Sequence, residues 1–213
     1  MLVVFDWDGT VIDSAAKIVG SMQRAAHSCS LLPQTDEAIR NIIGLSLPEA
    51  VRRLYPQEEL AVRERLQQAY SREYIEADRI PCSLFAGVGE TLELLLQQGH
   101  HIAVATGKSR RGLDRVLSNM QWQDKFHATR CADETASKPD PLMLQQLMHE
   151  LNIPQQETFM VGDTEYDLEM AVKAGVRGIG VSYGAHAAER LHRYQPLAVV
   201  DNMLSILDLI HEQ

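Results

Sequence analysis

The sequence predicts an α/β fold: a doubly wound parallel sheet into which an all-helical domain is inserted. Three observations support this prediction. Short aliphatic runs without polar alternation recur along the chain, as in strands that are covered on both faces. Helical patterns lie between these runs. One long stretch, residues 14–82, carries helical patterns and no convincing strand.

Five aliphatic runs are typical of buried parallel strands. They are residues 2–5 (LVVF), 101–106 (HIAVAT), 158–162 (TFMVG), 178–182 (GIGVS) and 197–200 (LAVV). Helices are expected over residues 87–98, 141–151 and 165–174, the first and last ended by a glycine. Alternating strands and helices form right-handed β-α-β units, so we expect functional residues at the carboxyl ends of strands.

The stretch from residue 14 to residue 82 interrupts this alternation. Helices are expected there over residues 15–29, 36–43, 47–55 and 58–76, with prolines and a glycine between them. We therefore expect a sheet domain of residues 1–13 and 83–213 and a helical cap domain of residues 14–82. The stretch holds as many acids as bases, so the formal net charge of −9 lies in the sheet domain.

Composition and charge narrow the function classes. The chain of 213 residues is 45% hydrophobic and 23% charged, as in ordinary globular proteins. Its net charge of −9 disfavours a nucleic-acid partner, and no apolar run is long enough to span a membrane. Three widely spaced cysteines suggest neither a disulfide framework nor a zinc site. We expect a cytoplasmic monomer or homodimer that acts on a small molecule.

The strongest chemical signal is the pair Asp6 and Asp8, which follows the first predicted strand and precedes Gly9. In an extended segment alternate side chains share a face, so both carboxylates can point into one pocket. Paired acids suit a division of labour between a nucleophile or metal ligand and a general acid. Taken alone, the pattern fits an ordinary Asp-Gly turn equally well.

Three further strand ends carry polar groups. Thr106 and Gly107 stand where a strand gives way to a helix whose free amides can bind an anion. Lys138 directly precedes a helix start, and Asp163 and Asp167 lie on one side of an opening helical turn, where Mg²⁺ could take oxygen ligands. Individually these residues also fit helix caps or solvated surface charges. Their combination and order favour a shared site.

With these four elements in this order, the whole sequence resembles the haloacid dehalogenase-like hydrolase superfamily, in particular its phosphoglycolate phosphatase-like group with a small helical cap. The resemblance implies a Rossmann-like core and a magnesium-dependent phosphatase. Asp6 would form an aspartyl phosphate, Asp8 would be the general acid and base, and Thr106, Gly107 and Lys138 would hold the phosphoryl group. Mg²⁺ would be bound by Asp6, the Asp8 backbone carbonyl and Asp163, with Asp167 behind them.

Several alternatives within and beyond this superfamily stay open. Asp8 argues against the haloacid- and phosphonate-cleaving members, and Thr10 favours hydrolysis over sugar phosphomutase activity. Phosphoglycolate, pyrophosphate, a nucleotide and a sugar phosphate all remain candidate substrates, and a retired enzyme serving as a regulatory or binding module is a further alternative. Arg52 and Arg53 of the predicted cap would clamp a substrate carboxylate or second phosphate, or else lie on a solvated helix face.

Overall fold

The centre of the molecule is a parallel sheet. The computed structural model describes residues 1–77 and 82–211, and within them the 6-stranded sheet has the order β3-β2-β1-β4-β5-β6. All neighbouring strands pair in parallel, so the predicted doubly wound α/β fold is confirmed. The strands are β1 (Leu2–Phe5), β2 (His101–Thr106), β3 (Ala128–Cys131), β4 (Thr158–Gly162), β5 (Arg177–Val181) and β6 (Ala198–Val200).

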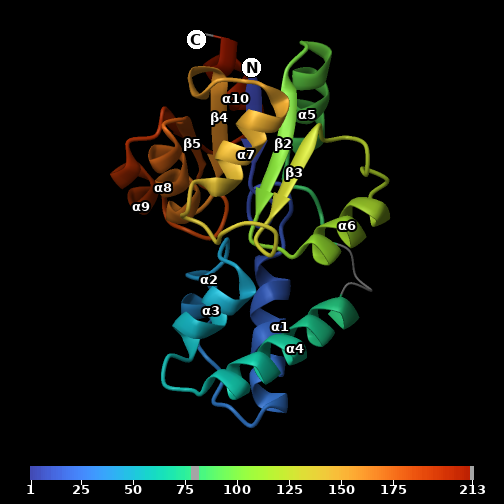
Figure 1. Cartoon of the computed structure of the whole chain (residues 1–213), viewed down its shortest axis with the longest axis vertical. Coiled ribbons are helices and arrows are strands. Elements are labelled where there is room, and N and C mark those ends of the chain that lie inside the picture. Colours follow the sequence, from blue (N-terminus) through green and yellow to red (C-terminus); the bar gives the residue numbers. More distant parts are fainter. Residues whose placement is uncertain (78–81, 212–213) are drawn as a thin grey trace.

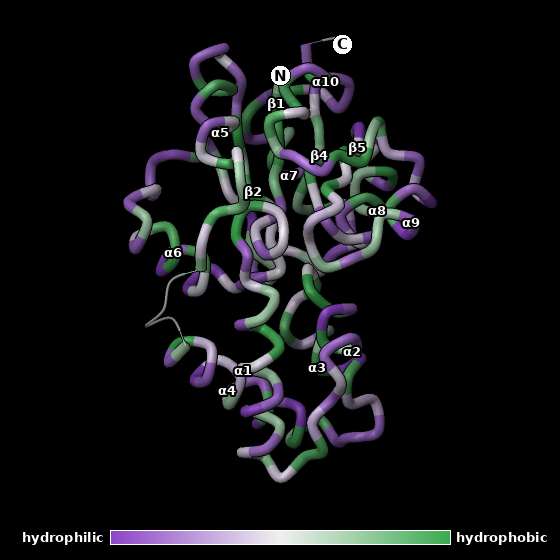
Figure 2. The backbone as a smooth tube through the Cα atoms, turned by 180° about the vertical axis from the view of Figure 1, so that it is seen from behind, coloured by the Kyte–Doolittle hydropathy of each residue, from purple (hydrophilic) through white to green (hydrophobic). Residues whose placement is uncertain are grey.

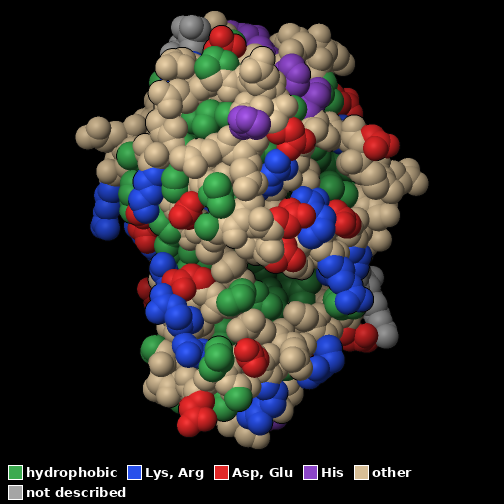
Figure 3. All heavy atoms as spheres, in the orientation of Figure 1, with side chains coloured by type: hydrophobic (Ala, Val, Ile, Leu, Met, Phe, Trp, Pro, Cys, Tyr) green, Lys and Arg blue, Asp and Glu red, His purple; other side chains and the backbone are tan. Residues whose placement is uncertain are grey.

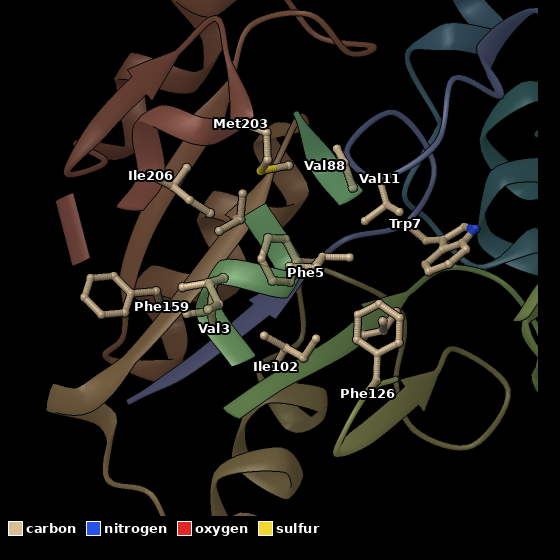
Figure 4. Close-up of a cluster of buried hydrophobic side chains, with 14 of the residues drawn as sticks. Val3, Phe5, Trp7, Val11, Val88, Ile102, Phe126, Phe159, Met203 and Ile206 are labelled. Atoms are coloured by element: carbon tan, nitrogen blue, oxygen red, sulfur yellow. The ribbon is translucent and has the colours of Figure 1, made fainter. Parts of the chain in front are cut away.

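Strand β1 lies in the middle of the sheet and is buried on both faces. Val3 and Phe5 contribute to one hydrophobic cluster, part of which is shown in Figure 4, whereas Leu2 and Val4 contribute to a second cluster. This two-sided burial explains why the sequence of β1 is continuously apolar. In Figure 2 the tube is correspondingly hydrophobic along β1 and β4.

Helices cover both faces of this sheet. The remaining elements of the sheet part are α5 (Val88–Gln97), α6 (Arg110–Asn119), α7 (Leu142–Leu151), α8 (Glu165–Ala174), α9 (Ala188–Leu191) and α10 (Ile206–His211), with 3-10 turns at Gln155–Glu157, His192–Tyr194 and Met203–Ser205. Helices α5, α6 and α10 bury their apolar residues in the cluster that contains Phe5, and α7 and α8 bury theirs in the cluster that contains Val4. No helix of the described residues combines the length and apolar character needed to cross a membrane.

The helical part consists of α1 (Ala15–Ser28), α2 (Asp36–Arg40), α3 (Leu47–Leu54) and α4 (Leu60–Ala77). It has a hydrophobic cluster of its own, to which α8 adds only Tyr166. The side chains of Thr35 and Ser46 accept hydrogen bonds from the first turns of α2 and α3 and so fix where these helices begin. Figure 1 shows the helical part facing the carboxyl ends of the strands.

The predicted elements differ from the observed ones in a few places. Helix α2 ends at Arg40, three residues before the predicted end, and β5 begins one residue early, at Arg177. Strand β3 and helices α9 and α10 were not predicted. The predicted cap boundary at residue 82 adjoins residues 78–81, which lie outside the described residues, and the division into two domains stays a proposal.

Candidate active site

Three adjacent strands deliver the central side chains of the site. Asp6 follows β1, Thr106 is the last residue of β2, and Asp163 follows β4. Because β1 pairs with both β2 and β4, these three residues meet at one edge of the sheet. All are buried, with exposed fractions of 1%, 0% and 0%. The Asp6 N–H donates to the Val161 carbonyl oxygen over 2.9 Å, which continues the strand pairing up to the acid.

Lys138 brings a positive charge into this buried edge. Its Nζ donates to Asp6 Oδ1 over 2.5 Å and to Asp167 Oδ1 over 2.6 Å. Burial by itself would lower the pKa of Lys138, but the carboxylates of Asp167 and Asp6 outweigh it and raise the pKa. Lys138 therefore remains an ammonium ion between the two carboxylates.

The carboxylates outnumber this ammonium ion. One oxygen each of Asp6, Asp163 and Asp167 lie within 4.8 Å of one another. Burial, together with the neighbouring charge of Asp167, raises the pKa of Asp163 to about 7. Burial likewise raises the pKa of Asp6, although Lys138 opposes this shift. The cluster is therefore short of positive charge.

The donor set fits a divalent cation such as Mg²⁺. All its side-chain donors are carboxylate oxygens, which hard cations prefer. Asp6 Oδ2 is buried and has no hydrogen-bond partner among the described residues. Both oxygens of Asp167 already accept hydrogen bonds, Oδ1 from Lys138 and Oδ2 from the N–H and hydroxyl of Thr164. The unpartnered oxygen makes Asp6 suited to bind the cation directly, and the bond to the Lys138 ammonium group suits Asp167 to a place behind it. The direct role of Asp163 stays a prediction.

Two loops pack directly against Asp163 and hold it in place. Gly9, at φ +91°, and Gly184 approach so closely that a Cβ atom on either would lie 2.2 Å from a side-chain atom of Asp163. The hydroxyl of Thr10 donates to Asp163 Oδ1 over 2.8 Å, and the Ala185 N–H donates to Oδ2 over 2.7 Å. The glycine that follows Asp8 thus serves close packing as well as the turn.

Asp8 lies beside the carboxylate cluster and has different partners. It is 8% exposed, and its Oδ1 accepts a hydrogen bond of 2.6 Å from Ser14 and lies 3.0 Å from Lys108 Nζ. Lys108 also donates to the Tyr74 hydroxyl of α4 over 3.1 Å. The carboxylate of Asp8 is not one of the three clustered groups. The use of the Asp8 backbone carbonyl as a metal ligand stays a prediction.

Lys108, Ser14 and Thr10 were not identified from the sequence as functional residues. A lysine two residues beyond a strand end resembles any surface lysine, and nothing in the sequence indicates that it contacts both Asp8 and a residue of α4. The hydroxyl of Thr10 had one detectable signal, its place directly after the Asp8-Gly9 pair. Thr106 is buried as predicted, and its hydroxyl accepts a hydrogen bond of 3.2 Å from the Lys108 N–H.

A cavity of about 360 Å³ lies next to Asp8, between the helical part and the sheet part. Gly107 and Lys108 border it on the sheet side, whereas residues of α1, α3 and α4 border it on the helical side. Its lining does not include Arg52 or Arg53.

Arg52 and Arg53 instead lie on the surface of α3. Both pair with Glu49 on the same helix, at 2.7 Å. Arg53 also donates to the Tyr166 hydroxyl over 3.1 Å. Both guanidinium groups share the one carboxylate of Glu49, and neither residue borders the cavity. Their role as a substrate clamp stays a prediction.

The loop between α2 and α3 closes over the site. Tyr166 donates its hydroxyl to the Asn41 carbonyl over 2.8 Å, and the Ser46 N–H donates to Ser137 Oγ over 2.9 Å. Gly107 packs so tightly under this loop that a Cβ atom there would lie 2.4 Å from the Leu45 carbonyl oxygen. The two parts of the molecule thus contact each other through backbone atoms beside the site.

Comparisons with known proteins agree with this geometry. A family model described as haloacid dehalogenase-like hydrolase matches residues 3–181. A protein of Dickeya dadantii (strain 3937) named probable phosphatase IndB is 34% identical over 99% of this chain and 93% of its own length. A phosphoglycolate phosphatase of Pseudomonas putida is 28% identical over 97% of this chain and 78% of its own length. The crystal structure of a hydrolase from Pseudomonas syringae shares the fold, with a TM-score of 0.90 at 23% identity over 100% of this chain and 98% of that one.

Proposed function

The chain belongs to the haloacid dehalogenase-like hydrolase family, and from this premise we propose that it is a magnesium-dependent phosphatase that hydrolyses a small phosphomonoester through an aspartyl phosphate. One observation carries the proposal. Asp6 has one carboxylate oxygen bound to Lys138 and the other buried without a partner among the described residues, beside Asp163 and Asp167. A carboxylate held in this way can attack a phosphorus atom that is brought to the strand ends.

The first chemical step transfers the phosphoryl group to Asp6. A bond forms between an Asp6 oxygen and phosphorus while the bond from phosphorus to the ester oxygen breaks. Asp8 gives its proton to the departing oxygen, so the alcohol leaves neutral. The contacts of Ser14 and Lys108 with Asp8 Oδ1 fix this carboxyl group, and we assign the proton transfer to Oδ2.

The second step releases inorganic phosphate. A water molecule attacks phosphorus and gives a proton to Asp8, while the bond between Asp6 and phosphorus breaks. We assign the binding of phosphoryl oxygens to Thr106 and to the backbone N–H of Gly107, at the end of β2. Lys138 offsets negative charge at Asp6.

The residues that would hold Mg²⁺ are Asp6 and Asp163, with Asp167 orienting them. When bound, the ion would offset the charge of the carboxylates and of the phosphoryl oxygens. The lack of positive charge in the cluster and the unpartnered Asp6 Oδ2 support this assignment.

We further propose that residues 14–82 act as a mobile cap. The chain leaves and re-enters the sheet part at adjacent points, where the Asp13 N–H donates to the Ser83 carbonyl over 2.9 Å. An aspartyl phosphate must be shielded from bulk water, yet one water has to be admitted later, so the cover has to move. Two adjacent connections between the parts suit a hinge for such a motion.

Cellular setting and assembly are part of the same proposal. The thiols of Cys29, Cys82 and Cys131 are all free, which supports a reducing cytoplasm. We propose a monomer or homodimer without a nucleic-acid or membrane partner.

The test is release of inorganic phosphate by the purified protein. Phosphoglycolate and a small aryl phosphate serve as substrates, because a relative is named phosphoglycolate phosphatase and an aryl ester has a leaving group that departs readily. The expected result is turnover of at least one ester in Mg²⁺, lost in the Asp6→Asn variant. Turnover in that variant equal to the wild type would overturn the assignment of the nucleophile.

A further inference from the structure

The cavity beside Asp8 differs in character between its two sides. Its helical side is lined by apolar side chains of α1, of residues 42–45, of α3 and of α4. They are Ile18, Met22, Ile42, Ile43, Leu45, Leu47, Pro48, Ala50, Tyr70, Tyr74 and Ile75. In Figure 3 hydrophobic side chains are visible in the hollow between the two parts of the molecule. An apolar wall of this extent favours a ligand that buries apolar surface.

The sheet side of the same cavity is polar and mainly basic. Lys108, Arg111 and Arg115 line it, and Asp8 is the only carboxylate among the residues of the lining. All three basic residues belong to α6 or to the turn before it, which follows Thr106. Positive charge thus lies on the side where the phosphoryl group would sit, and apolar surface lies on the opposite side.

The size of the cavity exceeds what a two-carbon group requires. Its volume of about 360 Å³ lies in the range of about 300–1,000 Å³ that is typical of small-molecule sites. Glycolate has five non-hydrogen atoms, and burying its carboxylate against the apolar wall would cost desolvation without a partner there. A group as large as a ring or a six-carbon chain would fill the space and cover the wall.

From this division of surfaces we propose that the substrates are phosphomonoesters whose alcohol carries an apolar body of ring or six-carbon size, bound against α1, α3 and α4. This inference rests on the proposed phosphatase function and narrows its substrate class. The phosphoryl end reaches Asp6 past Asp8, and the apolar body stays in the cavity. Phosphoglycolate would be a poor substrate by comparison.

Binding is tested without turnover by calorimetric titration with ethyl, butyl and hexyl phosphonate in Mg²⁺. These compounds share one phosphonate head group and cannot lose an alcohol, so the series isolates apolar burial. The expected Kd falls about threefold to fourfold for each added methylene, and inorganic phosphate competes with every member. A flat series, or a trend that phosphate does not compete with, overturns the inference.

Two variants of α4 locate the apolar contact. Ile75 lines the cavity and is 44% exposed, whereas Leu60, on the same helix but outside the lining, is 64% exposed. Because neither side chain is buried, replacing either by serine should leave the fold intact. Ile75→Ser should weaken hexyl phosphonate about threefold to tenfold and leave ethyl phosphonate unchanged, while Leu60→Ser changes neither. Equal losses in both variants would contradict the placement.

The same series as phosphate esters separates this inference from the proposed function. Ethyl, butyl and hexyl phosphate have leaving alcohols of nearly equal acidity, so a rise of kcat/KM along the series reports binding of the chain. Hydrolysis of all esters at equal kcat/KM, or a preference for phosphoglycolate, overturns the substrate class but keeps the phosphatase. A rising affinity for phosphonates without hydrolysis of any ester overturns the phosphatase but keeps the apolar site.

Discussion

The contact of Gly107 with the loop between α2 and α3 predicts a strong effect of a single added methyl group. In Gly107→Ala the new Cβ would lie 2.4 Å from the Leu45 carbonyl oxygen and 2.6 Å from that of Gly44, whereas real Cβ contacts are essentially never under 3.0 Å. Both opposing atoms belong to the backbone, so no side-chain rotation relieves the overlap. The loop must therefore retreat from the sheet part.

The expected cost follows from this overlap. Overpacking of a close contact costs about 1–3 kcal/mol. If the closed arrangement forms in every catalytic cycle, the same free energy lowers kcat/KM about fivefold to 150-fold. The three atoms nearest to the new methyl group all belong to the loop, so the melting temperature of the sheet part should change little.

The assay measures kcat and KM for phosphate release together with a thermal melt. Gly89→Ala is the matched control: Gly89 lies in α5, and the nearest atom to its Cβ would be Leu84 Cδ1 at 3.8 Å. It should keep wild-type kinetics and gain stability, because alanine is favoured over glycine in helices by about 1 kcal/mol. Wild-type kcat/KM in a folded Gly107→Ala protein would refute the idea that closure of the loop is needed.

Four further outcomes are expected. Asp6→Asn should remove nearly all phosphate release, whereas Asp8→Asn should lower kcat by a factor of about a hundred to ten thousand; equal losses in both would contradict their different roles. Chelation of divalent cations should abolish turnover, and added Mg²⁺ should restore it. At a hundredfold excess over its Kd, Mg²⁺ should also raise the free energy of unfolding by about 2.7 kcal/mol and with it the melting temperature. Full activity in chelator would refute the metal requirement. Lys108→Met removes a charged contact to Asp8 and should lower kcat/KM about tenfold to a hundredfold, while Lys173→Met, which breaks an exposed pair, serves as its control. Arg52→Ala should leave kcat/KM within about twofold for every substrate; a selective loss for one substrate would restore its role in recognition.

The central strands were predictable because apolar side chains cover both of their faces. The predicted bounds of β1, β2 and β4 agree with the structure residue by residue, since strands covered on both faces require continuous apolar sequence. Strand β3 was missed because its sequence, ATRC, is not continuously apolar. Its residues Thr129 and Arg130 are only partly buried, so they carry no apolar signal.

The site was predictable to the extent that it follows from topology. Asp6 and Asp163 each follow a strand, Thr106 ends one, and Lys138 precedes a helix. The carboxyl ends of parallel strands lie at one edge of the sheet, which brings such positions together. Contacts that depend on side-chain reach across the two parts were not predictable. The ammonium group of Lys108 contacts Asp8 and also the hydroxyl of Tyr74 in α4.

The apolar wall of the cavity was equally hidden in the sequence. Residues such as Ile18, Leu47 and Tyr74 have the spacing of ordinary core positions of amphipathic helices. Whether such a side chain faces the core of its own domain or a space between domains depends on how the helices are docked. The sequence instead pointed to Arg52 and Arg53 of α3 as specificity residues, and these two side chains pair with Glu49.

The position of β1 between β2 and β4 has a consequence for the order in which the protein becomes active during synthesis. Asp6 is translated long before the residues that complete its surroundings. Asp163, for example, lies 153 residues after Thr10, to which it is hydrogen-bonded. A nascent chain that lacks β4 leaves one edge of β1 unpaired and has neither Asp163 nor the Ala185 N–H that holds it. Such a chain lacks groups that the proposed mechanism requires. Because the site draws on both early and late segments, activity appears only once most of the chain has left the ribosome and folded.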